Sequence, residues 1–162
     1  MKKLVLFDMD GTLSDDRQRK PLADAQDWDG YFSYDAQMAD AVYGHGRALY
    51  EEMLFNGWEI GYLTARLERN RLATVDWLTR FGFINPGRAI LRPELLSAYR
   101  PPRFKSLMVG ALISLEEYDE IVLVDNDPEV VERVAADHGD RFTFFADWDQ
   151  DPETASLAIV QN

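Results

Sequence analysis

Five short runs of apolar residues alternate along the chain with longer segments in which apolar residues recur every three or four positions. The runs cover residues 3–8, 58–64, 88–92, 120–125 and 141–146. The periodic segments cover residues 46–57, 68–82, 104–118 and 127–139. Short apolar runs bounded by turn residues are typical of buried strands, and the longer period is typical of helices. The alternation predicts an α/β fold with a mostly parallel central sheet and helices on both faces.

Residues 14–46 interrupt this alternation and show little clean periodicity. We expect them to form a short insertion after the first strand that lies over the strand ends. The aromatic residues Trp28, Tyr31 and Phe32 either pack within this insertion or form a lid that stacks on a nucleobase. No repeat or linker divides the chain, so we predict one domain over residues 1–162, with 14–46 as a small cap-like insertion.

The composition is that of a globular protein, with 46% hydrophobic and 28% charged residues in a chain of 162. Cysteine is absent, which excludes disulfides, thiolate zinc sites and cysteine nucleophiles. No run approaches the roughly 20 apolar residues of a membrane-spanning helix. The N-terminal "MKKLVLFD" also lacks the features of a secretory signal. We therefore expect a cytoplasmic protein without a membrane partner.

The net charge of −12 argues against tight, sequence-independent binding to a nucleic-acid backbone, which depends on many cationic contacts. The charge is uneven, because residues 66–105 contain nine cations and three acids. This stretch either forms a positive surface that attracts a phosphorylated ligand or consists of solvated helix and loop arginines.

Acidic and polar residues follow three of the predicted strands. The carboxyl ends of parallel strands meet at one edge of the sheet, where ligands bind in such folds. We therefore expect one cluster, formed by Asp8, Asp10, Thr64, Arg66, Asp125 and Asp127. Asp125 and Asp127 have a second interpretation, since Pro128 follows them and fits the first turn of a helix that they would cap.

Carboxylates that converge repel one another unless they bind protons or a cation. Magnesium prefers oxygen ligands and is commonly held by a few carboxylates together with a substrate phosphate. We therefore predict a Mg²⁺ site formed by Asp8, Asp10, Asp125 and Asp127. In such a site Asp8 is suited to attack phosphorus as a nucleophile, and Asp10 to act as general acid and then as base.

A phosphoryl group in its transition state carries negative charge on its equatorial oxygens, which donors and cations stabilise. Thr64 can supply a hydroxyl and a backbone N–H at the end of its strand. Lys105, at the start of a predicted helix, can supply a point charge, although a solvated helix lysine is the alternative. Arg66 can supply a forked pair of donors.

These residues resemble the haloacid dehalogenase superfamily of aspartyl-phosphate phosphohydrolases. Four signatures occur in the expected order, namely "FDMDGTL", the threonine of "YLTAR", Lys105 and "LVDND". The resemblance spans roughly residues 4–146. It implies a Rossmann-like three-layer core, magnesium, a nucleophilic Asp8 and an acid/base Asp10. It further implies that Thr64 and Lys105 contact the phosphoryl group and that Asp125 lies near the metal.

A narrower resemblance is to the phosphatase domains of polynucleotide kinase/3′-phosphatases and their phage relatives. It rests on "QDWDGYF", on "LTAR" followed by "ERNRLATVDWL", and on "ILRPE" before "PPRFK". It implies substrate-binding roles for Arg17, Arg66 and Arg92, and a kinase domain or subunit as a partner. That group has two adjacent acids where this chain reads Asp125-Asn126-Asp127, so Asp125 is the favoured metal ligand and Asp127 an outer candidate.

Together these features predict a Mg²⁺-dependent phosphomonoesterase acting on a nucleotide or on the 3′-phosphate of a polynucleotide. A small soluble phosphomonoester, such as a nucleoside monophosphate or a sugar phosphate, is the near alternative. From another class, a receiver-like signalling module also gathers acids, Thr and Lys at strand ends. Receivers place the phosphorylated aspartate after the third strand, whereas Asp8 here follows the first predicted strand. A phosphatase-like binding protein without activity is a third hypothesis.

Overall fold

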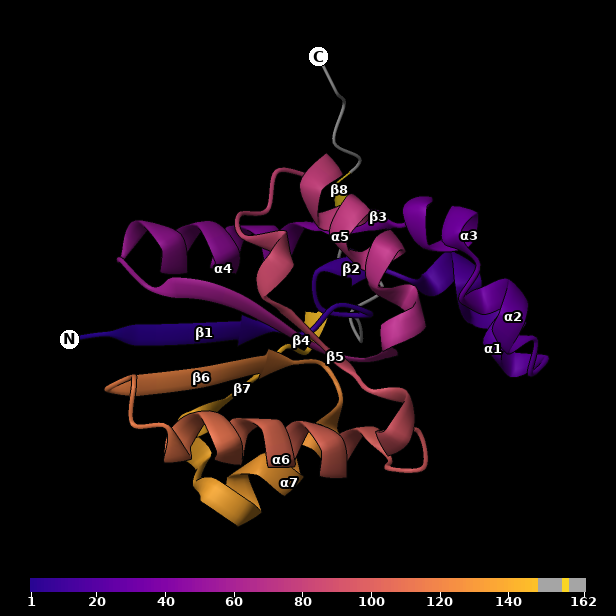
Figure 1. The fold of residues 1–162 in the computed structure, drawn as a ribbon. Coiled ribbons are helices and arrows are strands. Elements are labelled where there is room, and N and C mark those ends of the chain that lie inside the picture. Colours follow the sequence, from indigo (N-terminus) through magenta and orange to yellow (C-terminus); the bar gives the residue numbers. More distant parts are fainter. Residues whose placement is uncertain (149–155, 158–162) are drawn as a thin grey trace.

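The computed structural model describes residues 1–148 and 156–157, and its central feature is a five-stranded sheet (Figure 1). All strand pairs in this sheet are parallel. The order β5-β4-β1-β6-β7 joins Ala89–Arg92, Glu59–Leu67, Lys3–Phe7, Glu120–Asp125 and Thr143–Phe145. Counted along the chain, this order is 3-2-1-4-5, as in Rossmann folds. The predicted α/β class with a mostly parallel sheet is therefore confirmed.

The central strand β1 is buried on both faces because its side chains alternate between two hydrophobic cores. Val5 and Phe7 belong to one core, which includes Trp77 and Tyr50. Leu4 and Leu6 belong to the other core, which is completed by side chains from the last two helices. Alternation with period two is what an extended strand between two helical layers requires.

Two pairs of helices cover the two faces of the sheet (Figure 1). On one face lie α4 (Gly44–Phe55) and α5 (Arg71–Arg80), and on the other lie α6 (Pro101–Ser114) and α7 (Pro128–His138). The sequence predicted all four, with differences at their ends. The helix expected over 104–118 begins three residues earlier, because Pro101 occupies the first turn, where a missing N–H costs nothing.

The insertion contains short elements that the sequence pattern did not reveal. Strands β2 (Ser14–Asp15) and β3 (Ala41–Tyr43) pair antiparallel and form a second small sheet with β8 (Ser156–Leu157). Between β2 and β3 lie α1 (Lys20–Asp24), α2 (Trp28–Tyr31) and α3 (Tyr34–Met38). Helices of four or five residues are too short to show a hydrophobic period. Helices α1, α2 and α3 lie at the end of the molecule toward which β1 points (Figure 1).

The strand order reverses between β1 and β6, because the chain leaves β1 toward β4 and β5 and later returns to the other side of β1. Open α/β sheets bind ligands at the carboxyl ends of the two strands that flank such a point. Asp8 directly follows β1, and Asp125 is the last residue of β6. The fold alone therefore identifies this end of the sheet as the place to look for a site.

Candidate active site

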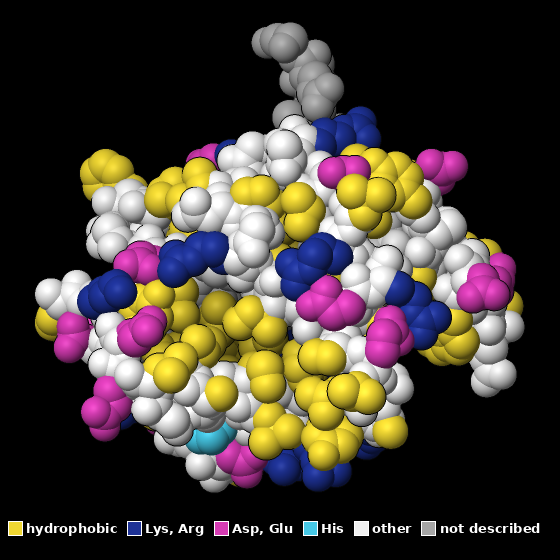
Figure 2. Space-filling view, viewed as in Figure 1, with side chains coloured by type: hydrophobic (Ala, Val, Ile, Leu, Met, Phe, Trp, Pro, Cys, Tyr) yellow, Lys and Arg dark blue, Asp and Glu magenta, His cyan; other side chains and the backbone are white. Residues whose placement is uncertain are grey.

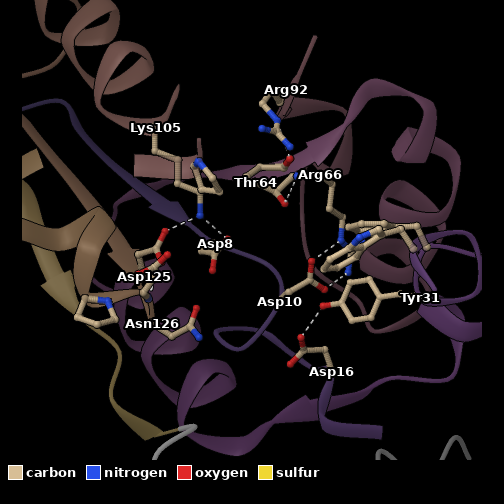
Figure 3. Close-up of a pocket in the computed structure, with 16 residues that line it drawn as sticks. Asp8, Asp10, Asp16, Tyr31, Thr64, Arg66, Arg92, Lys105, Asp125 and Asn126 are labelled. Atoms are coloured by element: carbon tan, nitrogen blue, oxygen red, sulfur yellow. Dashed lines mark hydrogen bonds and ion pairs between the residues drawn. The ribbon is translucent and has the colours of Figure 1, made fainter. Parts of the chain in front are cut away.

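Two carboxylates and one ammonium group form the centre of the site (Figure 3). The Nζ atom of Lys105 donates to Asp8 Oδ1 at 2.7 Å and to Asp125 Oδ2 at 2.5 Å. Lys105 comes from the first turns of α6, while the two acids come from neighbouring strands. All three side chains are at most 7% exposed. Residues separated by about a hundred positions in the chain are thus brought to one point.

The charges at this point do not cancel, because the single positive charge of Lys105 lies between two carboxylates. Burial, followed by the charge of Asp125, raises the pKa of Asp8 to about 7. Burial also raises the pKa of Asp125. Burial opposes the charge on Lys105, but the two carboxylates outweigh that effect and raise its pKa. The pair of acids is therefore a site that favours an additional proton or cation.

Asp10 does not point toward this pair and is instead held by two arginines. Arg66 Nε donates to Asp10 Oδ2 at 2.9 Å, and Arg66 Nη2 donates to Oδ1 at 2.5 Å. Arg19 Nη2 also donates to Asp10 Oδ1, at 2.6 Å. Burial alone would raise the pKa of Asp10, but the guanidinium groups lower it well below its ordinary value. Asp10 is therefore held as an anion.

Arg19 is a site residue that the sequence did not single out. Its side chain is 2% exposed and also pairs with the fully buried carboxylate of Asp40, from Nη2 to Oδ2 at 2.6 Å. Arg17, which the narrower resemblance implied, instead forms a 2.7 Å ion pair with Asp15, and its side chain is 37% exposed. The two arginines lie two residues apart in an irregular segment, so the pattern offered no basis for choosing between them.

The turn after β1 brings a threonine and a glycine against the β6 end. Thr12 Oγ1 lies 3.2 Å from Asp8 Oδ2 and 3.3 Å from Asn126 Oδ1, so its single proton can be donated to either. Gly11 has a φ of +85°, and a Cβ atom there would lie 2.2 Å from Asn126 Nδ2. Only glycine fits this turn, because both its backbone angle and the space beside it exclude a side chain.

Thr64 and Arg92 line the same cavity as Asp8. Thr64 is buried, and its hydroxyl oxygen accepts a hydrogen bond from the Arg66 backbone N–H at 3.1 Å. In that contact the hydroxyl accepts, so its proton can be donated to a ligand. Arg92 donates to the backbone carbonyls of Ala65, Ser97 and Tyr99, which fixes its half-buried side chain.

The four predicted metal ligands do not all converge. Within residues 1–148 no three His, Asp or Glu side chains are arranged to hold one ion. Asp10 points to the arginines, and Asp127 accepts from the Glu129 N–H at 2.9 Å, which caps α7. Asp8 and Asp125 contact the same nitrogen atom and are thus close enough to share an ion. Two carboxylates suffice for Mg²⁺, which keeps several waters and binds substrate phosphate.

The excess of cations in residues 66–105 does not produce a bare positive surface. Four of these arginines form ion pairs with glutamates, and Figure 2 shows Lys and Arg side chains next to acidic ones on this face. The pairs are Arg69–Glu94, Arg71–Glu68, Arg88–Glu59 and Arg100–Glu129. No helix in the described part of the chain is long and apolar enough to cross a membrane.

Comparisons with family models and with curated protein sequences each gave no match. Solved structures do match. One is a chain of the Pnkp1/Rnl/Hen1 RNA repair complex, with a TM-score of 0.62 and 19% identity over 90% of this chain. The present chain spans 42% of the length of that neighbour. Another is the class C acid phosphatase from Bacillus anthracis with tungstate bound, with a TM-score of 0.61 and 15% identity, covering 95% of this chain and 74% of that chain.

The fold is shared. At these identities the likeness concerns the path of the chain, and the activity has to be argued from the residues of the site.

Proposed function

We propose that this chain is a Mg²⁺-dependent phosphomonoester hydrolase of the haloacid dehalogenase type, which transfers the phosphoryl group to Asp8. The observation that carries the proposal is the contact of Lys105 Nζ with both Asp8 and Asp125 at the point where the strand order reverses. A buried carboxylate beside an ammonium group, open to a cavity, is a nucleophile placed to meet a phosphate. The fold shared with an acid phosphatase supports the same conclusion.

In the first step, an oxygen of Asp8 forms a bond to phosphorus while the bond from phosphorus to the leaving oxygen breaks. Asp10 gives a proton to that leaving oxygen. In the second step, Asp10 removes a proton from a water molecule that attacks phosphorus, and the bond to Asp8 breaks. Lys105 and Thr64 donate to the phosphoryl oxygens, on which negative charge accumulates.

The two arginines that hold Asp10 favour its anionic form. This is the form that a base requires in the second step, although the same contacts weaken it as a base. The acid role needs a protonated carboxyl group, so bound substrate must draw one guanidinium group away from Asp10. The substrate phosphate is an anion that can do so, because arginine binds phosphate with the same forked geometry as it binds carboxylate.

Asp8 and Asp125 would hold the magnesium ion, while Asp127 caps α7 by accepting a hydrogen bond from the Glu129 N–H. When bound, the ion would offset the negative charges of Asp8 and of the substrate phosphate, which otherwise repel each other.

Within this class we propose a phosphate on a nucleotide or on a polynucleotide 3′ end as the substrate. The likeness to a chain of an RNA repair complex supports it, as does a cavity mouth that includes Trp28 and Phe32. A kinase domain or subunit as a partner belongs to the same proposal. A small soluble phosphomonoester remains the competing substrate, because the cavity also fits a compact ligand.

The receiver-like alternative loses support from the sheet. Receivers have the strand order 2-1-3-4-5, whereas this sheet has the order 3-2-1-4-5. A measurement of phosphate release separates the two classes. Incubated with p-nitrophenyl phosphate and MgCl₂, the chain should release many phosphates per molecule and should stop when EDTA is added. Release of about one phosphate per chain, or none, would contradict a hydrolase.

The substrate is then identified by comparing 3′-phosphorylated oligonucleotides, nucleoside monophosphates and sugar phosphates at equal concentration. The proposal predicts the highest kcat/KM for a nucleotide or an oligonucleotide 3′-phosphate. A sugar phosphate that is hydrolysed fastest would overturn this choice of substrate and leave the reaction class intact.

A further inference from the structure

Three aromatic side chains of the insertion line the cavity that contains Asp8, and one of them is largely exposed. Tyr31 is 8% exposed, whereas Trp28 is 53% exposed. Trp28 lies stacked against Phe32, with ring centroids 6.5 Å apart and planes inclined by 28°. Packing inside the insertion would bury the indole, and here half of its surface faces solvent at the mouth of the cavity.

Tyr31 is held in place by Asp16 and by Arg19, the arginine that also contacts Asp10. Tyr31 donates its hydroxyl hydrogen bond to Asp16 Oδ2 at 2.7 Å. Arg19 donates to the Tyr31 backbone carbonyl at 3.1 Å, and its guanidinium carbon lies 4.4 Å from the centroid of the Tyr31 ring. The same guanidinium group holds Asp10. In Figure 3, Tyr31 and Asp16 lie beyond Asp10, on the side of the site away from Lys105 and Asp125.

The residues around Trp28 make an ionic contact with a polyanion unfavourable. Asp27 and Asp29 flank Trp28 in the chain, and both are exposed. A second phosphate would be repelled here, whereas an uncharged aromatic ring would not. Stacking on a nucleobase is tolerant of base identity, because every base presents a flat π-face.

From this arrangement we propose that Trp28 and Phe32 form a platform for the nucleobase of the nucleotide whose phosphate reaches Asp8. The proposal rests on the phosphatase function proposed above and specifies which part of the leaving group the enzyme recognises. The platform is preorganised, because Arg19 and Asp16 hold Tyr31, and the Tyr31 ring packs edge-on against both Trp28 and Phe32. Binding of a ligand therefore loses little conformational entropy in these side chains.

The test compares two secondary phosphate esters, a nucleoside 3′-monophosphate, which carries a base, and glycerol 2-phosphate, which has neither base nor ribose ring. In Trp28→Ala, kcat/KM for the nucleotide should fall about tenfold more than kcat/KM for glycerol 2-phosphate, as expected for the loss of one stacked base. Trp28→Phe should recover most of the difference. Phe55→Ala removes an aromatic ring that is 91% exposed and lies outside the cavity, so it should leave both values unchanged.

Equal losses of kcat/KM on both substrates in Trp28→Ala, or no loss on either, would overturn the platform. Absence of turnover on every phosphomonoester would instead contradict the proposed function. In that case the platform is tested by measuring affinity. A nucleoside 3′-monophosphate should bind Asp8→Asn with a dissociation constant about tenfold lower than that of the double variant Asp8→Asn, Trp28→Ala. Equal affinities in that titration would also overturn the platform.

Discussion

The carboxylate of Asp10 accepts hydrogen bonds from two buried guanidinium groups, and one of them was not expected from the sequence. Arg19 bridges Asp10 and Asp40, while Arg17 pairs with Asp15, whose side chain is only 10% exposed. Arg100 forms an exposed pair with Glu129. Removing one partner of a buried ion pair leaves an uncompensated charge, whereas an exposed pair contributes little. Arg19 and Arg100 should therefore differ sharply in their effect on stability.

Arg19→Ala should lower the free energy of unfolding by about 3 kcal/mol or more, and kcat by at least about tenfold. Arg100→Ala, which removes an exposed ion pair with Glu129, should change the free energy of unfolding by less than about 1 kcal/mol. Urea unfolding and steady-state phosphate release measure both. Since Arg19→Ala could unfold the chain, Arg19→Lys provides a folded variant that keeps the charge and loses the fork. A larger loss of activity in Arg17→Ala than in Arg19→Lys would favour the role that the sequence assigned to Arg17.

The raised pKa of Asp8 predicts how stability depends on pH in the absence of metal. Its pKa is about 7 in the folded chain, compared with 3.8 for an ordinary aspartate. The folded state therefore binds a proton that the unfolded state has released between these values. This contribution to stability is fully present below about pH 4 and is lost as the pH rises through about 7.

In EDTA, Asp8→Asn should thus be more stable than the wild type at pH 8, by on the order of 2 kcal/mol, and the difference should vanish near pH 4. Thermal unfolding at several pH values measures this. Asp24→Asn, which changes an exposed carboxyl group, serves as the control and should show no such trend. A wild type that is more stable than Asp8→Asn at pH 8 would contradict the assignment of Asp8 as a destabilised carboxylate.

At the scale of elements, the site depends on the turn between β1 and β2 fitting against the end of β6. Gly11 has no room for a Cβ atom, because Asn126 lies beside it and the backbone angle is in the left-handed region. A side chain there must displace the side chain of Asn126, the residue that follows Asp125. The turn thus links the position of one strand end to that of the next.

Gly11→Ala should lower the free energy of unfolding by about 1–2 kcal/mol from the backbone angle alone, with a further cost from displaced Asn126. It should also lower kcat, because a displaced Asn126 side chain would disturb Thr12, whose hydroxyl lies between Asn126 and Asp8. Gly87→Ala is the matched control, since a Cβ atom at Gly87 meets nothing within 4 Å, and it should change stability by less than about 0.5 kcal/mol. Wild-type kcat in a folded Gly11→Ala variant would contradict this view of the turn.

At the scale of the whole molecule, the sequence predicted the parallel core because its strands and helices are long enough to show a period. The segment expected as a strand over 120–125 coincides with β6, and the four major helices differ only at their ends. The insertion could not be predicted in the same way. Its helices contain four or five residues, and its strands two or three, so neither period repeats.

The site was predicted to the extent that strand ends and motifs determine it. The structure brings Asp8, Lys105 and Asp125 together, and the predicted contact of Lys105 with a phosphoryl group stays a prediction. The sequence did not reveal in which direction the Asp10 side chain points. It contacts Arg19 and Arg66 and does not point toward Asp125. The exposed indole of Trp28 likewise depends on the orientation of α2, which local sequence does not determine.

The central claim, that Asp8 accepts the phosphoryl group, is tested most directly by trapping that group on the chain. Asp10→Asn lacks the base of the second step, and p-nitrophenolate leaves without needing a proton from an acid. When this variant is mixed with p-nitrophenyl phosphate and MgCl₂ and quenched in acid, peptide mass spectrometry should find one phosphoryl group on Asp8. Phosphorylation of another residue, or steady phosphate release by Asp8→Asn, would contradict the account.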